Sequence, residues 1–165
     1  MKKIFAIGLL AAIAGFAACQ NHNQAKTAVA STSLHVTDTA KAYQQYLNLK
    51  DNLVKTDGKA AQESAKQLVE PLSKINGCSD AAQMAGQIAA TADVKKQRAV
   101  FMTLSQDMIP LVKGIKSNKA PVYVQYCPMA GGGKGGYWLS AQKEVKNPYY
   151  GDDMLECGEV KEEIK

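Results

Sequence analysis

DVKKQRAVFMTLSQDMIPLVKG, at residues 93–114, is the stretch of sequence that decides the fold of this chain. Its large apolar residues recur at spacings of seven, three, four and three: Val94, Phe101, Leu104, Met108 and Leu111. That spacing predicts an α-helix with one apolar face. Asp93 is a favoured residue for the helix amino terminus, and Pro110 and Gly114 mark the end. A helix of this kind needs other elements to cover its apolar face.

Helical patterns also precede this stretch. The first starts at Asp38 and is predicted to stop at Gly58, with apolar positions at Ala40, Tyr43, Tyr46, Leu47, Leu53 and Val54. The second is expected to bend at Pro71, with apolar positions at Ala61, Ala65, Leu68, Leu72 and Ile75. Ser79 and Asp80 are expected to cap a short third helix. Short connections between amphipathic helices predict an antiparallel helical bundle.

Polar and sulfur-containing side chains on these helices are expected to be structural. Arg98 and Ser105 lie on or beside the apolar face of the last helix, where we expect buried polar anchors. Met84, Met102 and Met108 stand at helical spacings, and methionine at such positions usually fills gaps in a core.

After residue 114 the composition changes to β-branched and aromatic residues. Residues 121–126 predict a strand that delivers Cys127 to its end, and 137–139 predict a second short strand. The glycine-rich loop 130–136 joins them; its Lys134 lacks the following Ser or Thr of a nucleotide-binding loop. The expected fold class is therefore mainly α, an antiparallel helical bundle with a small C-terminal β-hairpin and loop region that carries the Cys and Met motifs.

Charge and composition exclude some classes of function. The chain has 165 residues and a formal net charge of +5, a surplus too small to predict nucleic-acid binding. Acidic residues gather near the C-terminus, where we expect a solvated tail: Asp152, Asp153, Glu156, Glu159, Glu162 and Glu163. The two histidines, His22 and His35, lie in or beside a polar segment. No convincing pair of base and nucleophile is present, so an enzyme is not expected.

The amino terminus has the pattern of a secretion signal. Lys2 and Lys3 precede an almost wholly apolar run of 15 residues, 4–18, which is shorter than the ~20 that a spanning helix needs. Cys19 follows small residues, as the lipidated cysteine of a bacterial lipoprotein does. We therefore expect a signal peptide at 1–18 and a lipid anchor at Cys19.

The rest of the chain divides into a tether and one domain. Residues 19–36 are small and polar, which predicts a flexible tether. Residues 37–165 form a single domain of ordinary size, with a helical part at 37–116 and a Cys/Met motif region at 121–160. We expect this domain on the periplasmic side of a bacterial membrane, and we favour the outer membrane over the inner one.

The Cys/Met motif region carries the most specific chemistry. Cys127, Met129, Met154 and Cys157 are two thiols and two thioethers, the soft donors that select monovalent copper or silver. Cys127 and Cys157 are equally able to form a disulfide in an oxidising compartment, which leaves no thiolate ligand. Both alternatives stay open on the sequence alone. Once Cys19 is lipidated, three cysteines remain, and Cys78 is the natural one to stand outside the Cys127–Cys157 pair, with a third metal ligand or a redox partner as its alternative roles.

A second candidate site consists of aromatic residues in the same region. Tyr137, Trp138, Tyr149 and Tyr150 are predicted to form an exposed patch. With a Cys127–Cys157 disulfide as a staple, such a patch would dock another envelope protein. This is the alternative to a metal-binding function.

Four motifs resemble a known family. They are Tyr-Val-Gln-Tyr-Cys-Pro-Met-Ala at 123–130, Trp-Leu-Ser at 138–140, Asn-Pro-Tyr-Tyr-Gly at 147–151 and Met-Leu-Glu-Cys-Gly at 154–158. Together they resemble the DUF3347 family over about Asp38 to Val160. The resemblance implies a domain of envelope lipoproteins or heavy-metal efflux adaptors that is associated with copper or silver handling. It implies the matching soft positions Cys127, Met129, Met154 and Cys157.

Overall fold

The structure is a computed structural model that describes the backbone of residues 30–115 and 120–165, with side chains described from residue 37 onward in these ranges. The predicted signal peptide at 1–18, the lipidation site Cys19 and most of the predicted tether lie outside the described residues. Among the residues described, no helix is long and apolar enough to cross a membrane.

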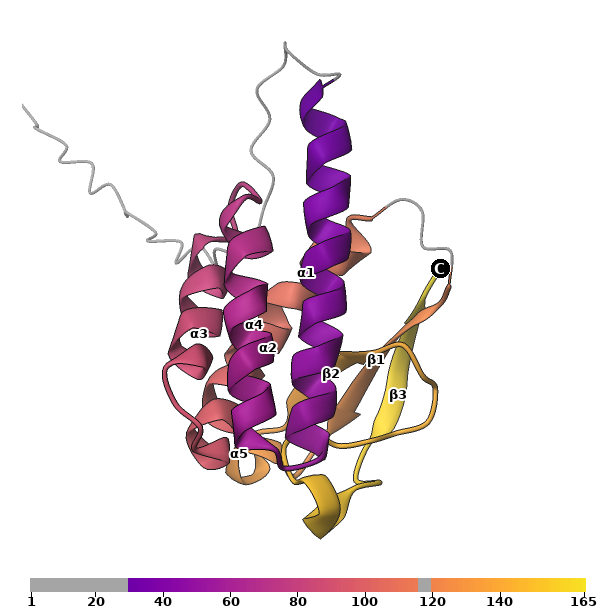
Figure 1. The fold of residues 1–165 in the computed structure, drawn as a ribbon. Coiled ribbons are helices and arrows are strands. Elements are labelled where there is room, and N and C mark those ends of the chain that lie inside the picture. Colours follow the sequence, from indigo (N-terminus) through magenta and orange to yellow (C-terminus); the bar gives the residue numbers. More distant parts are fainter. Residues whose placement is uncertain (1–29, 116–119) are drawn as a thin grey trace, which may run out of the picture.

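The described chain is mainly helical. Its long helices are α1 (Ala30–Val54), α2 (Gly58–Ser73), α3 (Ser79–Ala89) and α4 (Val94–Lys113). Each packs against the next in the order of the chain, as Figure 1 shows. In α4 the side chains of Phe101, Leu104 and Met108 are fully buried, as their spacing predicts. In α2 the buried stripe contains the predicted Ala61, Ala65, Leu68 and Leu72.

The helix ends differ in detail from the sequence expectation. α1 begins at Ala30, so helical backbone extends into the segment predicted as a tether. It ends at Val54, and Thr56 turns the chain with φ +58°. Gly58 does not stop α1 but begins α2. A Cβ at Gly58 would lie 2.0 Å from the carbonyl oxygen of Ala92, so this glycine allows a close approach between α2 and the α3–α4 connection.

A side-chain cap marks the start of α4 but not the start of α3. The Asp93 carboxylate accepts the backbone N–H groups of Lys95 and Lys96, as predicted for the start of α4. The N-cap of α3 is Cys78, with no side-chain capping bond, so the predicted caps Ser79 and Asp80 are wrong. Asp80 lies instead in the first turn, where a negative charge complements the helix dipole.

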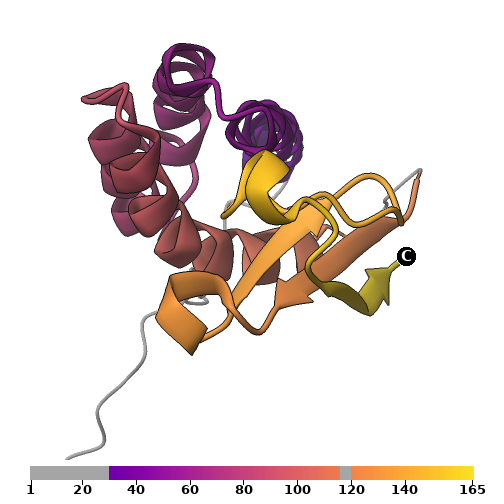
Figure 2. The same ribbon diagram turned by 90° about the horizontal axis from the view of Figure 1, so that it is seen from below.

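A three-stranded antiparallel sheet follows the helices in the chain. β1 (Val122–Cys127) pairs with β2 (Gly136–Ser140) and with β3 (Glu159–Ile164), in the order β2-β1-β3. The short α5 (Ala130–Gly133) joins β1 to β2, and the 3-10 helix η1 (Gly151–Met154) precedes β3. Figure 2 shows the helices on one side of the molecule and the sheet on the other.

The sheet confirms the predicted hairpin and corrects the predicted tail. β1 and β2 are the two strands expected at residues 121–126 and 137–139. The third strand was missed, because residues 159–164 were expected to be a solvated acidic tail. Its residues Val160 and Ile164 are the less exposed positions, and charged residues occupy all of the others.

The hydroxyl of Tyr46 joins the helices to the sheet. It lies 2.7 Å from the Ser105 hydroxyl on α4 and accepts the Leu139 N–H of β2 at 3.1 Å. Tyr46 and Ser105 are fully buried, so Ser105 is the polar anchor that the sequence predicts. Tyr149 donates its hydroxyl proton to the Tyr137 carbonyl of β2. Both tyrosine hydroxyls bond to backbone groups of β2 that point away from β1.

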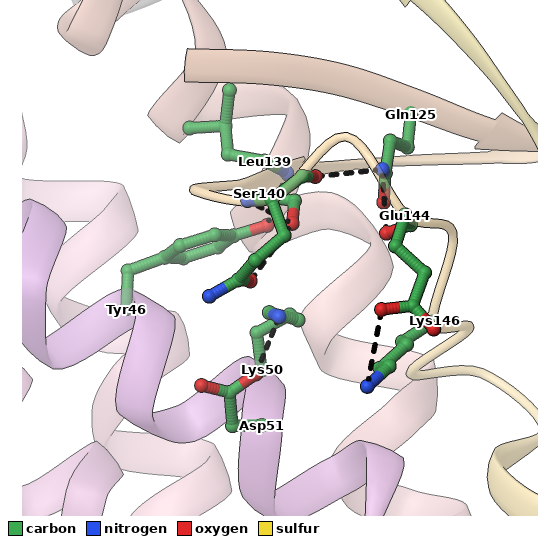
Figure 3. A network of polar contacts seen from close by, with 9 residues as sticks. Tyr46, Lys50, Asp51, Gln125, Leu139, Ser140, Glu144 and Lys146 are labelled. Carbon is green, nitrogen blue, oxygen red and sulfur yellow. Dashed lines mark hydrogen bonds and ion pairs between the residues drawn. The ribbon is translucent and has the colours of Figure 1, made fainter. Parts of the chain in front are cut away.

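A second polar contact lies one helical turn along α1. Tyr46 and Lys50 extend from α1 toward the end of β2 and the loop that follows it (Figure 3). The Lys50 side chain is only 2 % exposed and its ammonium pairs with the carboxylate of Asp51. Above it, the Gln125 amide donates toward the carbonyl oxygens of Gln142, Lys143 and Glu144, each at 3.1 Å. Gln125 thereby holds this loop against the sheet.

The role of the Tyr46 hydroxyl can be measured by removing it. In Tyr46→Phe the Leu139 N–H loses its acceptor in a buried site, which costs about 1–3 kcal/mol of unfolding free energy. We expect urea denaturation to show that loss. Tyr43→Phe is the matched control, because the buried Tyr43 hydroxyl has no hydrogen-bond partner among the described residues. Equal stability losses in the two variants would contradict the role given to Tyr46.

Candidate functional site

Cys127 and Cys157 form the centre of the candidate site. Cys127 is the last residue of β1 and is fully buried, whereas Cys157 is half-buried and stands just before β3. The structure brings their sulfur atoms to 2.6 Å across a separation of 30 residues. This is only about half an ångström longer than an S–S bond of roughly 2.05 Å. The two thiols are therefore placed to bond to each other or to a shared partner.

The buried side chain of Asn147 positions Cys157. Its amide donates to the Cys157 carbonyl at 2.8 Å, and its side-chain oxygen accepts the Tyr149 N–H at 2.8 Å. Its backbone N–H donates to the Leu155 carbonyl, and its carbonyl accepts from Gly151. Residues 147–157 thus fold around Asn147 into one turn.

Arg98 attaches that turn to the helices. Its guanidinium donates to the Pro148 carbonyl at 2.8 Å and to the Leu53 carbonyl at 2.9 Å. It also donates to the Thr56 hydroxyl at 3.0 Å. A Cβ at Gly151 would lie 2.6 Å from this guanidinium, and Gly151 has φ +60°, so glycine is required there. Arg98 is half-buried and acts as the anchor that the sequence predicts, between α1, α4 and the turn before Cys157.

The electrostatics of the pair keep Cys157 protonated. Its hydrogen bond with Cys127 raises the pKa of the Cys157 thiol, and desolvation adds to this. A backbone hydrogen bond from Met129 acts in the opposite direction and is the smaller effect. In the reduced protein Cys157 is therefore protonated at neutral pH, and metal binding through it must release that proton.

Met129 and Met154 contact the pair through their backbones. The Met129 backbone reaches the Cys157 thiol, and the Met154 carbonyl accepts the Cys157 N–H at 3.1 Å. The Met129 side chain is 51 % exposed, and that of Met154 is half-buried. Within residues 37–115 and 120–165, no group of three or more His, Cys, Asp or Glu side chains is placed to hold a metal ion. The structure thus brings the backbones of both methionines to Cys157.

The predicted aromatic patch is wrong for two of its four members. Trp138 is fully buried and Tyr149 is 7 % exposed, and their rings meet edge to face with centroids 5.8 Å apart. The pleat of β2 explains why Trp138 is buried while its neighbour Tyr137 is exposed, because neighbouring residues of a strand point to opposite faces. Tyr137 is 38 % exposed and Tyr150 is half-buried, so these two remain accessible.

A line of ring contacts that the sequence did not predict connects the helices with the site. Tyr46 stacks on Phe101 at 5.2 Å, and Phe101 meets Tyr149 at 5.9 Å. Tyr149 in turn contacts Trp138, whose ring lies against Gly158, the residue after Cys157. The sequence indicates that Tyr46 and Phe101 are apolar-face residues but carries no local signal for their partners, which lie far along the chain.

The fold defines the class of protein, a mainly helical domain with a small antiparallel sheet. Comparison with known families then gives the family: residues 42–120 match the model of "Protein of unknown function (DUF3347)", and this stretch of the chain belongs to the DUF3347 family. The match comprises most of α1 through α4 and ends before β1. The helices therefore carry the family likeness, and the match does not include the motifs around Cys127 and Cys157.

Comparison with curated proteins and with solved structures gives no match.

The proximity of the two thiols has a chemical consequence that can be measured. Mild oxidation of the reduced protein should remove two hydrogens and block alkylation of Cys127 and Cys157. The new bond closes a 30-residue separation, so we expect it to raise the unfolding free energy by about 3.5 kcal/mol on the chain-entropy model. Intact mass and urea denaturation check both results, with Cys157→Ser as the control. Mixed disulfides between molecules as the main product would contradict the geometry.

Proposed function

We propose that this protein binds a monovalent soft metal ion, Cu(I) or Ag(I), through Cys127 and Cys157 as thiolates, with Met129 and Met154 as thioether ligands. It would buffer the ion or pass it to a heavy-metal efflux adaptor or another envelope protein. In this proposal the protein is not an enzyme. A lipid on Cys19 holds it on the periplasmic side of a bacterial membrane, and we favour the outer membrane over the inner one.

The exposure of Met129 is the observation that supports this proposal best. Met129 and Tyr137 are the exposed large apolar side chains of the described residues, and Met129 is the more exposed, at 51 %. A methionine that fills a core is buried, as Met108 is. An accessible thioether on a residue whose backbone contacts Cys157 is of no use to a disulfide staple but can supply a soft donor to a metal ion.

The donor set fits a soft ion after a small movement. Two sulfurs on one metal ion, each at roughly 2.3 Å, are held about 3.8–4.6 Å apart. The present 2.6 Å separation must therefore widen. Cys157 is the side chain suited to this movement, because it is half-buried in an irregular segment, whereas Cys127 is fully buried in a strand.

A second candidate function is a disulfide-stapled module that binds another envelope protein. The 2.6 Å separation of the two sulfurs favours a staple. With Trp138 and Tyr149 buried, the docking surface of this alternative shrinks to Tyr137 and Tyr150. It requires partner capture by the oxidised protein that is lost in Tyr137→Ala, with no preference for a metal ion.

Replacement of the buried thiol tests the metal proposal. We expect the reduced wild type to bind one equivalent of Cu(I) or Ag(I) in competition with a chromophoric chelator. Cys127→Ser should weaken that binding at least about tenfold, because the loss of a residue that only supports a metal ligand already costs about that much. Cys78→Ser is the control, because Cys78 belongs to the helical core. Unchanged uptake by Cys127→Ser would remove the basis of the proposal.

Metal affinity should also depend on pH with a defined sign. Because the pKa of Cys157 is raised, binding displaces a proton across the neutral range. The apparent affinity of the reduced protein should therefore rise with pH, by up to about tenfold per unit for each proton released. The rise ends only when the pH exceeds the pKa of the thiol. Competition titrations at a series of pH values check this, and a flat profile would mean that no thiol proton is displaced.

A further inference from the structure

Met102 lies against the turn that carries Met129. A Cβ built on Gly131 would be 3.0 Å from the Met102 sulfur and 2.8 Å from its terminal methyl carbon. The thioether of Met102 therefore occupies the space beside Gly131 where a side chain would otherwise stand. Met102 comes from α4, so this contact joins the helices to the segment that immediately follows Cys127.

The turn itself keeps Met129 close to that contact. Met129 is the N-cap of α5, and its carbonyl accepts the Gly133 N–H at 3.2 Å. Gly131 and Gly132 have φ +62° and +70°, which folds the chain tightly where Met102 approaches. Any residue other than glycine at 131 would be strained and would also collide with the Met102 thioether. One compact turn thus has Met129 at its start, and the sulfur of Met102 lies against its first glycine, Gly131.

Met102 and Met129 are both more exposed than the core methionine Met108, and Met102 also packs against the edge of the core. Met108 is fully buried, as the sequence predicts for all three helical methionines. Met102 is only half-buried, and Met129 is 51 % exposed. Solvent, and hence a dissolved cation, reaches both side chains.

We propose that Met102 and Met129 form a thioether site for a monovalent soft cation, and that this site works whether Cys127 and Cys157 are thiols or a disulfide. The inference rests on the proposed soft-metal function and adds Met102 to its ligands. Thiolates are lost as ligands when the disulfide forms, whereas thioethers are not consumed in that reaction. The thioether pair would hold the ion more weakly than the thiols and receive it at the accessible side of α5.

The test uses full-length protein with the Cys127–Cys157 disulfide formed, methyl-labelled at methionine and titrated with silver nitrate. We expect the methyl resonances of Met102 and Met129 to shift together and to saturate, while those of Met84 and Met108 stay unchanged. Met102→Leu should raise the dissociation constant by at least about tenfold, the lower end of what outer-shell changes cost. Met84→Leu is the matched control, because it makes the same substitution in α3 at another half-buried methionine.

The outcomes separate this inference from the proposed function. A saturable shift of Met129 without Met102, or the absence of any saturable shift, would overturn the thioether site. Leucine is close to methionine in volume, so Met102→Leu is expected to fold, and its melting temperature verifies that. Met129→Leu lies at an exposed position and should weaken silver binding equally. The thiol proposal is judged separately, by whether the reduced wild type binds more tightly than Cys127→Ser.

Discussion

The arrangement of this molecule depends on the hydrogen bonds of one buried hydroxyl group, that of Tyr46. It connects α1 to Ser105 on α4 and to the backbone of Leu139 on β2. A buried hydroxyl that makes two such bonds fixes both direction and distance, which apolar contacts alone do not. The helices and the sheet meet at this point, so the position of the sheet follows from the position of the helices.

The candidate site inherits its geometry from that junction. The ring of Tyr46 begins the series of aromatic contacts that continues through Phe101 and Tyr149 to Trp138. Tyr149 also bonds to Asn147, which in turn bonds to the carbonyl of Cys157. The approach of the two sulfurs is therefore the end of a chain of buried contacts that starts in α1. The helices covered by the family match supply the support on which the Cys pair rests.

The helical half could be predicted from the sequence because its signals are local. The stripe of α2, the core face of α4 and the Asp93 cap all follow from residue types at fixed spacings. Gly58 was misassigned as a stop, because its actual reason, the close approach of Ala92, involves residues far along the chain. β3 was missed since Glu159, Glu162 and Glu163 resemble a solvated tail, and only pairing with β1 makes that segment a strand.

For the site, the residue types correctly indicated which residues lie together, but the sequence did not indicate which of them are exposed. Cys127 and Cys157 do lie together, and the two methionine backbones adjoin them. Trp138 and Tyr149 were expected to be exposed, but they are buried and pack against each other. The contact of Met102 with Gly131 had no sequence signal either, because it depends on the left-handed turn of α5.

The two outer edges of the sheet resist unwanted strand addition in different ways. β3 carries its own charges, with ion pairs between Lys161 and Glu159 and between Lys165 and Glu163. β2 contains no charged residue, and the Tyr46 and Tyr149 hydroxyls occupy the outward N–H of Leu139 and carbonyl of Tyr137. An uncharged edge with free backbone groups is a template for aggregation. The same tyrosine that holds the two halves together thus also protects the chain from joining a neighbouring copy through β2.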